Sequence, residues 1–419
     1  GGICGDLSAG EIYGCSFTGT VKGSMVGGIS GVAGQHTMIS QCFFEGDVQG
    51  RHAAAGICGN SPFKVIDHCI SIAAIAGDED RAGIVHSGDS DATNCYFNND
   101  ICNVKDEYNL GRTTLQLTSS SFFEELKTNG FNTELWTKKA NDKENGIAYY
   151  PSLGENNAVG VNYTTGLQFE RADDAMPIYG QDITFKVKAL VNFATDGQPI
   201  SATDGQPISA EDTEGSFEIR IGDTPVVSAA DFKNGIATYK AQTVGNTTFT
   251  LVYTGTNSSF FPEQTTKDLT VNIAPAALTA DGEGIARGIY GTKLSGLTVN
   301  GLTAKLGNNV IDGSWKIDGD EIPYVGDSET YTATFVPEHP EYYQPLTAPV
   351  KLAIEKAEVS AIPMQNLYYS WAAKGEKEVQ IPGLPEDRGT TELISMVKSD
   401  DANVLATDQA IRYSEGKLI

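Results

Sequence analysis

The sequence predicts an all-β, multidomain protein, in which a short parallel β-helix with a small helical cap precedes tandem β-sandwiches. Three observations support this fold class. Similar blocks recur about every 27 residues over the first hundred residues, and apolar and polar residues alternate from about residue 156 onward. The chain of 419 residues also contains 46 glycines and almost no helical patterning, so many tight turns are expected.

Residues 1–104 are predicted to form the β-helix, with about 27 residues per rung. Repeats of this length cannot bury a core alone and must stack on their neighbours. Four blocks open with Gly-Gly-Ile or Ala-Gly-Ile, at residues 1–5, 27–31, 55–59 and 82–88. Each rung offers three short extended pieces, as at 11–17, 20–21 and 25–29. We expect the interior to be lined by Ile3, Ile29, Ile57 and Ile84, then by Ile12, Ile39 and Ile66, and then by the cysteines.

All seven cysteines lie before residue 103, and four recur at one position of successive repeats: Cys15, Cys42, Cys69 and Cys95. A secreted domain held by disulfides would have an even number of cysteines spread through its loops. We therefore favour free thiols stacked inside the solenoid, where cysteine acts as a small apolar residue. Neighbouring rungs lie about 4.8 Å apart, so disulfides between rungs stay open as the alternative.

The repeat pattern resembles a known family. Its Gly-Gly-Ile-x-Gly opening, Ile-x-x-Cys-x-Phe middle and Gly-x-Val-x-Gly close are similar to the GLUG repeat of bacterial surface proteins. That repeat also occurs in the non-catalytic region of some secreted immunoglobulin A metallopeptidases. The resemblance covers about a quarter of the chain, and the fourth copy departs from it at Val85-His86-Ser87. It implies a scaffold and assigns no catalytic residue.

Residues 105–155 are predicted to cap the solenoid, whose end would otherwise expose unpaired backbone and apolar surface. The segment 118–128 reads as a short helix that Ser119–Ser121 could cap, with Phe122, Phe123 and Leu126 on one face. Trp136 and the apolar run 147–151 follow, and together they resemble the tail found after GLUG repeats.

The remaining chain is predicted to form β-sandwiches at 156–275 and 276–357, with the start of a further module at 358–419. Ile178-Tyr179-Gly180 recurs as Ile289-Tyr290-Gly291, and the run 273–280 aligns with 354–361, 81 residues later. The segments 215–219, 234–239 and 313–315 resemble those of bacterial immunoglobulin-like repeats. We expect nearly linker-free joints that favour a stiff stalk. The duplication of 194–201 at 202–209 is interpreted as a lengthened surface loop.

The formal net charge of −25 argues against a nucleic-acid partner, because phosphate binding needs clustered Lys and Arg. It argues equally against an anionic membrane surface. No run of about 18 apolar residues occurs, so no membrane span is expected. The acidity is typical of a soluble extracellular protein. Because the chain begins inside a repeat, we expect this chain to be a portion of a longer secreted or surface protein. Tandem modules favour a monomer.

Metal or enzyme chemistry finds little support in the sequence. His68-Cys69 with Cys42 and Cys95 could be interpreted as a zinc site. Cysteines stacked in one column, however, do not place four ligands tetrahedrally around a metal ion. No Gly-x-Ser-x-Gly or His-Glu-x-x-His motif occurs. A polysaccharide lyase would need cations for uronates, whereas residues 1–104 hold four Lys and Arg against eleven Asp and Glu. We read the acidic run 78–80 as a solvated loop.

Two further features of the sandwich modules suggest ligands less directly. The turn 318–321, Asp-Gly-Asp-Glu, could hold calcium, although a solvated hairpin turn explains it as well. The aromatics at 342–343 and 368–371 could stack on sugar rings or pack in strand edges. We therefore assign no catalytic, cofactor-binding or metal-binding residue, and no cofactor apart from this calcium alternative.

The sequence therefore favours a non-catalytic, adhesin-like bacterial protein, extracellular or on the cell surface. Its solenoid and cap would present a surface to a host glycan or an extracellular protein, on an immunoglobulin-like stalk. The alternative is the accessory region of a larger secreted enzyme, a metallopeptidase or a glycan-active enzyme, whose catalytic domain lies outside this chain. A pure spacer is the third hypothesis.

Overall fold

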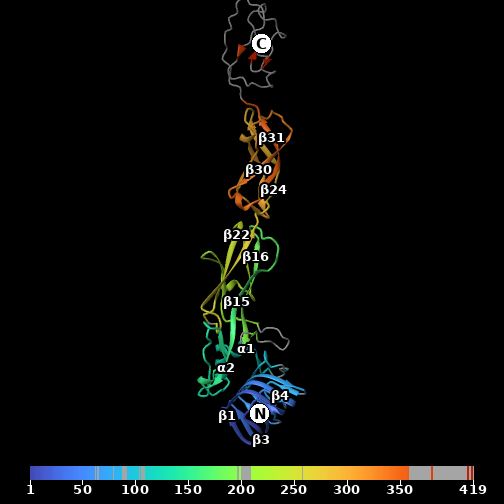
Figure 1. Cartoon of the computed structure of the whole chain (residues 1–419). Coiled ribbons are helices and arrows are strands. Elements are labelled where there is room, and N and C mark those ends of the chain that lie inside the picture. The colour runs from blue at the N-terminus through green and yellow to red at the C-terminus, as the bar shows by residue number, and fades with distance from the viewer. Residues whose placement is uncertain are drawn as a thin grey trace, which may run out of the picture. The chain divides into compact units, whose positions relative to one another are not determined.

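The computed structural model describes residues 1–61, 63, 66–78, 80–86, 92–102, 104, 109–195, 198–199, 209–256 and 258–357, with the backbone of three short strands beyond them (Figure 1). These are β32 (Val379–Gln380), β33 (Tyr413–Ser414) and β34 (Lys417–Leu418). The rest of the module predicted at 358–419 and most of the duplicated segment 194–209 lie outside the described residues. The chain divides into two compact units, Gly1–Ala274 and Pro275–Ile419.

The first unit begins with a parallel β-solenoid of about three turns at a spacing of about 27 residues, which confirms the predicted fold class. Two parallel sheets form its walls. One contains β1 (Cys4–Tyr13), β3 (Ser30–Ser40), β5 (Cys58–Asn60), β6 (Ile66–Asp67) and β9 (Ala92–Thr93). The other contains β2 (Ser16–Gly27), β4 (Phe43–Ala55), β7 (Ile70–Gly77), β8 (Asp80–Ala82), β10 (Tyr96–Asn98) and β11 (Gly111–Arg112).

The strands of the first two rungs differ from the three short pieces expected from the sequence. Each of these rungs has two long strands, of 10 to 13 residues. Gly10 and Gly19 adopt positive φ angles of 109° and 141°, so the chain bends inside a strand while pairing continues on both sides. These two glycines therefore bend the strands without ending them.

The interior of the solenoid is formed by the predicted columns. Ile29, Ile57 and Ile84 are fully buried, and so are Cys42, Cys69 and Cys95. Phe17 and Phe44 stack with their ring planes 5° apart, and Ser71 interrupts this aromatic column before Phe97. Side chains of the same kind therefore lie above one another along the solenoid, as a constant repeat length requires.

The segment after the solenoid contains α1 (Thr114–Leu117) and α2 (Ser120–Thr128), with β12 (Trp136–Thr137), β13 (Ile147–Tyr149) and β14 (Ser152–Leu153). Ser119 is the N-cap of α2, and its hydroxyl accepts a hydrogen bond from the Phe122 backbone N–H at 3.1 Å. Phe122 and Leu126 are buried as expected. The solenoid interior is filled at its last rung by Cys102, Val104 and Leu110, whereas the helical cap lies along the side of the rungs.

The first β-sandwich completes the first unit. One sheet is built from β13, β15 (Gly160–Arg171), β16 (Asp182–Thr195), β17 (Gln198–Pro199), β18 (Ser209–Glu211) and β21 (Ile236–Lys240). The other is built from β19 (Ser216–Ile221), β20 (Thr224–Val227), β22 (Gly245–Thr254) and β23 (Gln264–Ile273). One continuous hydrophobic core runs from Phe43, Ile70 and Tyr96 through the cap residues Phe122 and Trp136 into the sandwich, where it includes Phe185, Phe249 and Ile273.

The second unit contains another two-sheet sandwich. One sheet has β24 (Thr279–Asp281), β27 (Thr303–Leu306) and β28 (Asn309–Val310). The other has β25 (Gly284–Ile289), β26 (Thr298–Asn300), β29 (Gly313–Lys316), β30 (Thr330–Pro337) and β31 (Leu346–Glu355). Its core is smaller than that of the first unit and surrounds Ala286, Leu297, Ala333 and Val350.

The internal repeat between the two sandwiches has a structural counterpart. The Tyr179 N–H donates to the carbonyl of Ala274 at 2.9 Å, and the Tyr290 N–H donates to the carbonyl of Glu355 at 2.8 Å. The two acceptors are 81 residues apart, which is the offset found in the sequence. The glycine that follows each tyrosine has a positive φ angle, 80° at Gly180 and 98° at Gly291. Each module therefore bonds its Ile-Tyr-Gly segment to the end of its last strand in the same way.

Candidate functional site

The cap is held by a row of corner residues, one from each rung of the solenoid. Gly14, Gln41, His68 and Asn94 each precede a column cysteine and adopt φ angles between 48° and 62°. This left-handed conformation turns the corner and directs the side chain at Gln41, His68 and Asn94 toward the cap. Gln41 Oε1 accepts from Trp136 Nε1–H at 2.8 Å and from the Asn132 N–H at 3.1 Å.

His68 belongs to this corner row and not to the thiol column. Its Nε2 lies 2.9 Å from the carbonyl oxygen of Asn129, and its ring packs edge-on against Phe131 at 5.2 Å. Cys69 points into the solenoid, where its thiol donates to the Asp67 carbonyl at 3.1 Å. The four-ligand zinc arrangement drawn from the sequence is therefore not formed. Within the described residues, no group of three or more His, Cys, Asp or Glu side chains is arranged to hold a metal.

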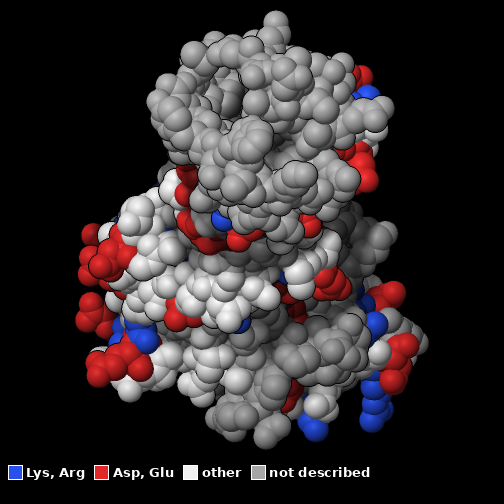
Figure 2. All heavy atoms as spheres, turned by 90° about the horizontal axis from the view of Figure 1, so that it is seen from above, with Lys and Arg blue, Asp and Glu red and all other residues white. Residues whose placement is uncertain are grey.

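The acidic segments are engaged locally where the structure describes them. Asp320, in the turn considered for calcium, pairs with Lys293 at 3.0 Å, and the whole turn 318–321 is exposed. Asp80 lies 3.7 Å from His86 Nε2, while Glu79 of the same acidic run is outside the described residues. Carboxylates are spread over the described surface in view (Figure 2), in keeping with the excess of 54 Asp and Glu over 29 Lys and Arg.

The aromatic residues of the second sandwich lie in two places. Tyr342 and Tyr343 meet edge-on at 6.4 Å, and Tyr342 also contacts the ring of His339. The aromatics at 368–371 lie outside the described residues. A separate hollow of about 300 Å³ is lined by Tyr324, Asp327 and Tyr331 among others. There the Tyr331 hydroxyl donates to Asp327 at 2.9 Å, and this hydrogen bond raises the pKa of Tyr331 to about 12.

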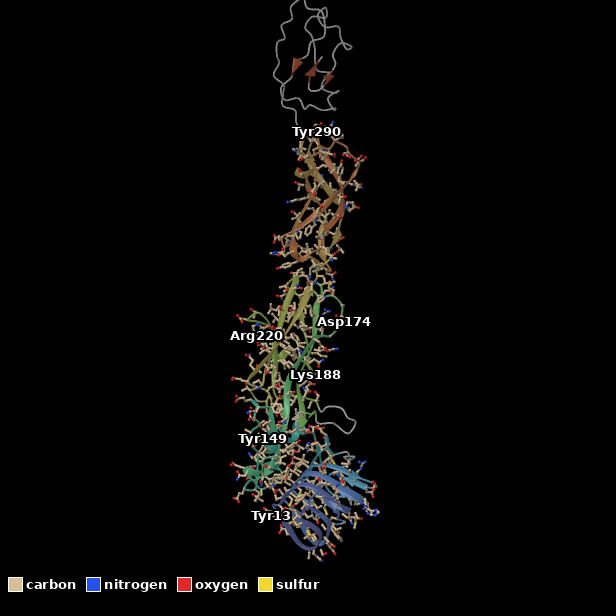
Figure 3. The ribbon with its side chains drawn as sticks, in the orientation of Figure 1. Tyr13, Tyr149, Asp174, Lys188, Arg220 and Tyr290 are labelled. Atoms are coloured by element: carbon tan, nitrogen blue, oxygen red, sulfur yellow. The ribbon has the colours of Figure 1, made fainter. Side chains whose placement is uncertain are left out.

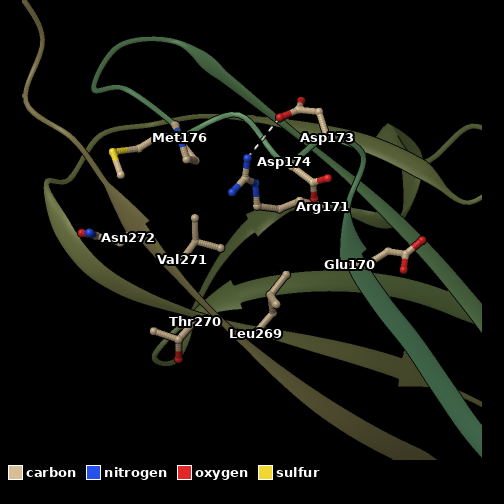
Figure 4. A pocket seen from close by; sticks show the side chains of 10 residues that line it. Glu170, Arg171, Asp173, Asp174, Met176, Leu269, Thr270, Val271 and Asn272 are labelled. Atoms are coloured by element: carbon tan, nitrogen blue, oxygen red, sulfur yellow. Dashed lines mark hydrogen bonds and ion pairs between the residues drawn. The ribbon is translucent and has the colours of Figure 1, made fainter.

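A hollow of about 470 Å³ in the first sandwich lies between the edges of its two sheets, beside β15 and β23 (Figure 4). It is lined by Glu170, Arg171, Asp173, Asp174, Met176, Pro177, Leu269, Thr270, Val271 and Asn272. The guanidinium of Arg171 is already bonded to the Asp173 carboxylate at 3.1 Å and to the carbonyl of Ala175. The remaining carboxylates make this open hollow better suited to a neutral or cationic group than to an anion.

The first two rungs carry a cluster of exposed side chains, which we call the first-rung patch: Glu11, Tyr13, His36 and Met38. The register pairs Glu11 with Met38 and Ala9 with His36, so these side chains share the outer face of β1 and β3. Tyr13 is 47% exposed and Met38 is 46% exposed. Tyr13 stands on the side of the solenoid (Figure 3), and its hydroxyl accepts from Asn132 of the cap at 2.9 Å.

The interior side chains of the first rung are partly exposed to solvent. We call this surface the open end. Ile3 is 45% exposed, although the equivalent isoleucines of the later rungs are fully buried. Cys15 and Phe17 are half-buried for the same reason. Among the described strands, none pairs with the outer edges of β1 and β2. The open end therefore joins unpaired backbone to exposed apolar side chains.

Sequence reasoning did not single out Tyr13 and Met38, although a signal was present. Each directly neighbours a residue of the predicted isoleucine column, Ile12 or Ile39. Because side chains alternate across a strand, a residue next to a buried isoleucine points outward. The outward orientation of Tyr13 and Met38 could therefore have been predicted from the repeat.

A polar seam joins the cap to the first sandwich. Glu214 accepts from the Ser121 hydroxyl at 3.2 Å and from the Ser259 N–H at 2.9 Å. Asn141 donates to the Ser259 carbonyl at 3.0 Å and accepts from Lys138 Nζ at 3.1 Å. Burial lowers the pKa of Lys138 to about 8, with the nearby Glu214 carboxylate opposing the shift. The lysine is therefore partly neutral at mildly alkaline pH.

Lys138→Met is expected to stabilise the first unit at pH 7 and to remove part of its pH dependence. The unfolded lysine titrates near 10.5 and the folded one near 8, so the charged side chain opposes folding below pH 8. That cost is relieved as the pH rises from 8 to 10.5, because the unfolded chain then binds more protons. Urea unfolding of both proteins at pH 7 and pH 9.5 tests this. A stability difference that does not shrink between these pH values would contradict it, and Lys139→Met, at an exposed neighbour, is the control.

Comparison with known proteins gives no family for the chain. No family model matches it, and no curated protein matches it. Among solved structures, the fibronectin(III)-like modules of Clostridium thermocellum CbhA are similar at 12% sequence identity and a TM-score of 0.16, over 48% of this chain and 100% of that chain. Within the described residues, no helix has the length and apolar content needed to cross a membrane.

Proposed function

We propose that this chain is a non-catalytic, adhesin-like protein of the bacterial surface or of the secreted fraction. Its solenoid and cap present the binding surface, and its β-sandwiches form the support. In this proposal the rungs are GLUG-type repeats and the sandwiches are bacterial immunoglobulin-like repeats, as the sequence patterns suggest. The chain acts as a monomer outside the cell.

The observation that supports this proposal is the distribution of exposed apolar side chains in the first unit. Among the described residues of that unit, six large hydrophobic residues are at least 45% exposed, and four of them lie within the first 38 residues: Ile3, Tyr13, Met25 and Met38. Solitary apolar residues on a surface need no explanation, but a concentration of them marks an interaction site. The shared core with the cap and sandwich holds this surface on a rigid base.

The side chains of the first-rung patch favour a protein partner. Tyr and Met are enriched at protein interfaces, and the flexible thioether of Met adapts to an irregular surface. Glu11 and His36 beside them provide polar contacts at the rim of the patch. A glycan could also stack on the Tyr13 ring, so it is the second class of partner that the experiment must separate.

The experiment is a binding screen of the whole chain against immobilised extracellular-matrix proteins, mucins and glycans. We expect saturable binding to a protein target that falls at least about tenfold in the double variant Tyr13→Ser, Met38→Ser, since two central anchors contribute on the order of 1.4 kcal/mol or more. Met176→Ser is the matched control, because Met176 is 62% exposed on the first sandwich. Binding that is lost equally in both variants, or absent over the whole array, would contradict this proposal.

A further inference from the structure

An early strand of the second sandwich, β25, lies beside its last strand, β31, and runs in the same direction. The pairing covers six residues of each strand, from Gly284 opposite Val350 to Ile289 opposite Glu355. Every other pair of strands described in this sandwich is antiparallel. Because parallel neighbours need a long crossover between them, this pair holds the beginning of the sandwich to its end.

Backbone hydrogen bonds extend this contact beyond both ends of β25. On the entry side, the Ala276 N–H donates to the Tyr342 carbonyl at 2.9 Å, and the Gln344 N–H donates to the Ala276 carbonyl at 2.8 Å. On the exit side, the Tyr290 N–H donates to the Glu355 carbonyl at 2.8 Å. At about 3.3 Å per residue, the first and last of these bonds are about 40 Å apart along the strand direction.

The chain enters and leaves the second sandwich at opposite ends of β31. Ala276 lies beside Tyr343, just before the strand begins, and Glu355 is the last residue of the strand. Tension applied to the chain on both sides of the sandwich therefore acts along the strands, in opposite directions on β25 and β31. The hydrogen bonds between the two strands run mainly across this direction, so tension acts on all of them at once.

Buried side chains on the two strands resist the same movement. Ala286 of β25 and Val350 and Ile354 of β31 belong to the core of the second sandwich and are at most 8% exposed. The backbones approach so closely that a methyl group on Gly284 would lie 2.5 Å from Cγ1 of Val350. Because close-packed side chains interdigitate, β25 cannot slide along β31 without opening the core.

We propose that the second sandwich has a mechanical function, in which the parallel pair of β25 and β31 keeps the module folded while the chain is under tension. The inference rests on the proposed adhesin-like function, in which a partner bound to the solenoid pulls on a chain that continues beyond Glu355. Tension then passes through the sandwich from Ala276 to Glu355, and the rate of unfolding under force is the property that the pair keeps low.

The test is single-molecule force spectroscopy on the whole chain, with handles attached through unnatural amino acids at exposed positions. Handles at Asn272 and Lys356 pull the sandwich along its strands. Handles at Ser328 and Lys356 pull at one end of β30 and β31, whose antiparallel pairs then open one after another. We expect the first pair of handles to need at least about twice the unfolding force of the second at the same pulling rate. A smaller ratio would overturn the proposal.

Two variants separate resistance to force from stability. Gly284→Ala inserts a methyl group between β25 and β31. Ile317→Val is the matched control, because Ile317 is 3% exposed in the same core but lies in neither strand. For each degree lost in thermal melting, Gly284→Ala should lower the force between Asn272 and Lys356 more than Ile317→Val does, and equal losses would contradict the proposal. If Gly284→Ala does not fold, the comparison of the two pulling directions decides.

The force measurement is independent of the binding screen. It contains no binding partner, so a low unfolding force would leave the proposed binding surface as it stands. A chain that bound nothing on the array could still show the expected difference between the two pulling directions.

Discussion

Trp136→Ala is expected to lower the free energy of unfolding of the first unit by about 3–5 kcal/mol, the cost of removing a large buried ring. Trp136 is only 1% exposed and packs edge-on against Phe43 of the solenoid and Phe131 of the cap, at 6.2 and 5.2 Å. The substitution also leaves the buried Gln41 Oε1 without the indole donor. The loss should therefore fall at the upper end of that range, as measured by urea unfolding followed by circular dichroism.

Trp136→Phe is the matched variant for the hydrogen bond. It removes the indole N–H and part of the indole ring but keeps one aromatic ring, so we expect a smaller loss of about 1–3 kcal/mol. If Trp136→Phe proved as damaging as Trp136→Ala, the six-membered ring that Phe retains would contribute nothing to the packing. If both variants unfolded like the parent protein, the cap would not be attached to the solenoid through this residue.

Gly28→Ala is expected to have the second-largest effect, a loss of about 3 kcal/mol or more, because overpacking of a rigid site strains its surroundings. A methyl group at Gly28 would lie 2.2 Å from Cγ of Phe44 and 2.3 Å from the backbone oxygen of Gly56. Neither neighbour can move freely, since Phe44 is fully buried and the Gly56 backbone belongs to the next rung. The midpoint of urea unfolding should fall accordingly.

Gly5→Ala controls for the intrinsic effect of replacing glycine in a solenoid strand. No atom lies within 4 Å of the position that its Cβ would take, so its unfolding midpoint should stay close to that of the parent. Equal midpoints for Gly28→Ala and Gly5→Ala would mean that the rungs are loosely stacked, contrary to the contacts around Gly28.

The sequence predicts the solenoid interior well because that interior is periodic. Ile29 and Ile57 could be placed from the repeat alone, and both are fully buried. The docking of the cap could not be predicted in this way, because Gln41 and Trp136 are 95 residues apart and no local pattern links them. The position of the helical segment along the side of the rungs follows from such distant contacts.

The proposed binding surface was predictable only as a region. The sequence places it on the solenoid and cap, and the exposed Tyr13 and Met38 fall within that region. The repeat indicates that both side chains point outward, but it does not specify which outward face of β1 and β3 the cap leaves uncovered.

The continuous core of the first unit has a consequence for how this protein can be divided. A cut after residue 155 looks natural in the sequence, but it would separate β13 from β15, whose residues Ile147 and Asn162 pair in one sheet. It would also strip the cap from Phe185 and its neighbours in the same core. The smallest piece of the solenoid that can be produced, or transferred to another protein by recombination, therefore extends to Ala274.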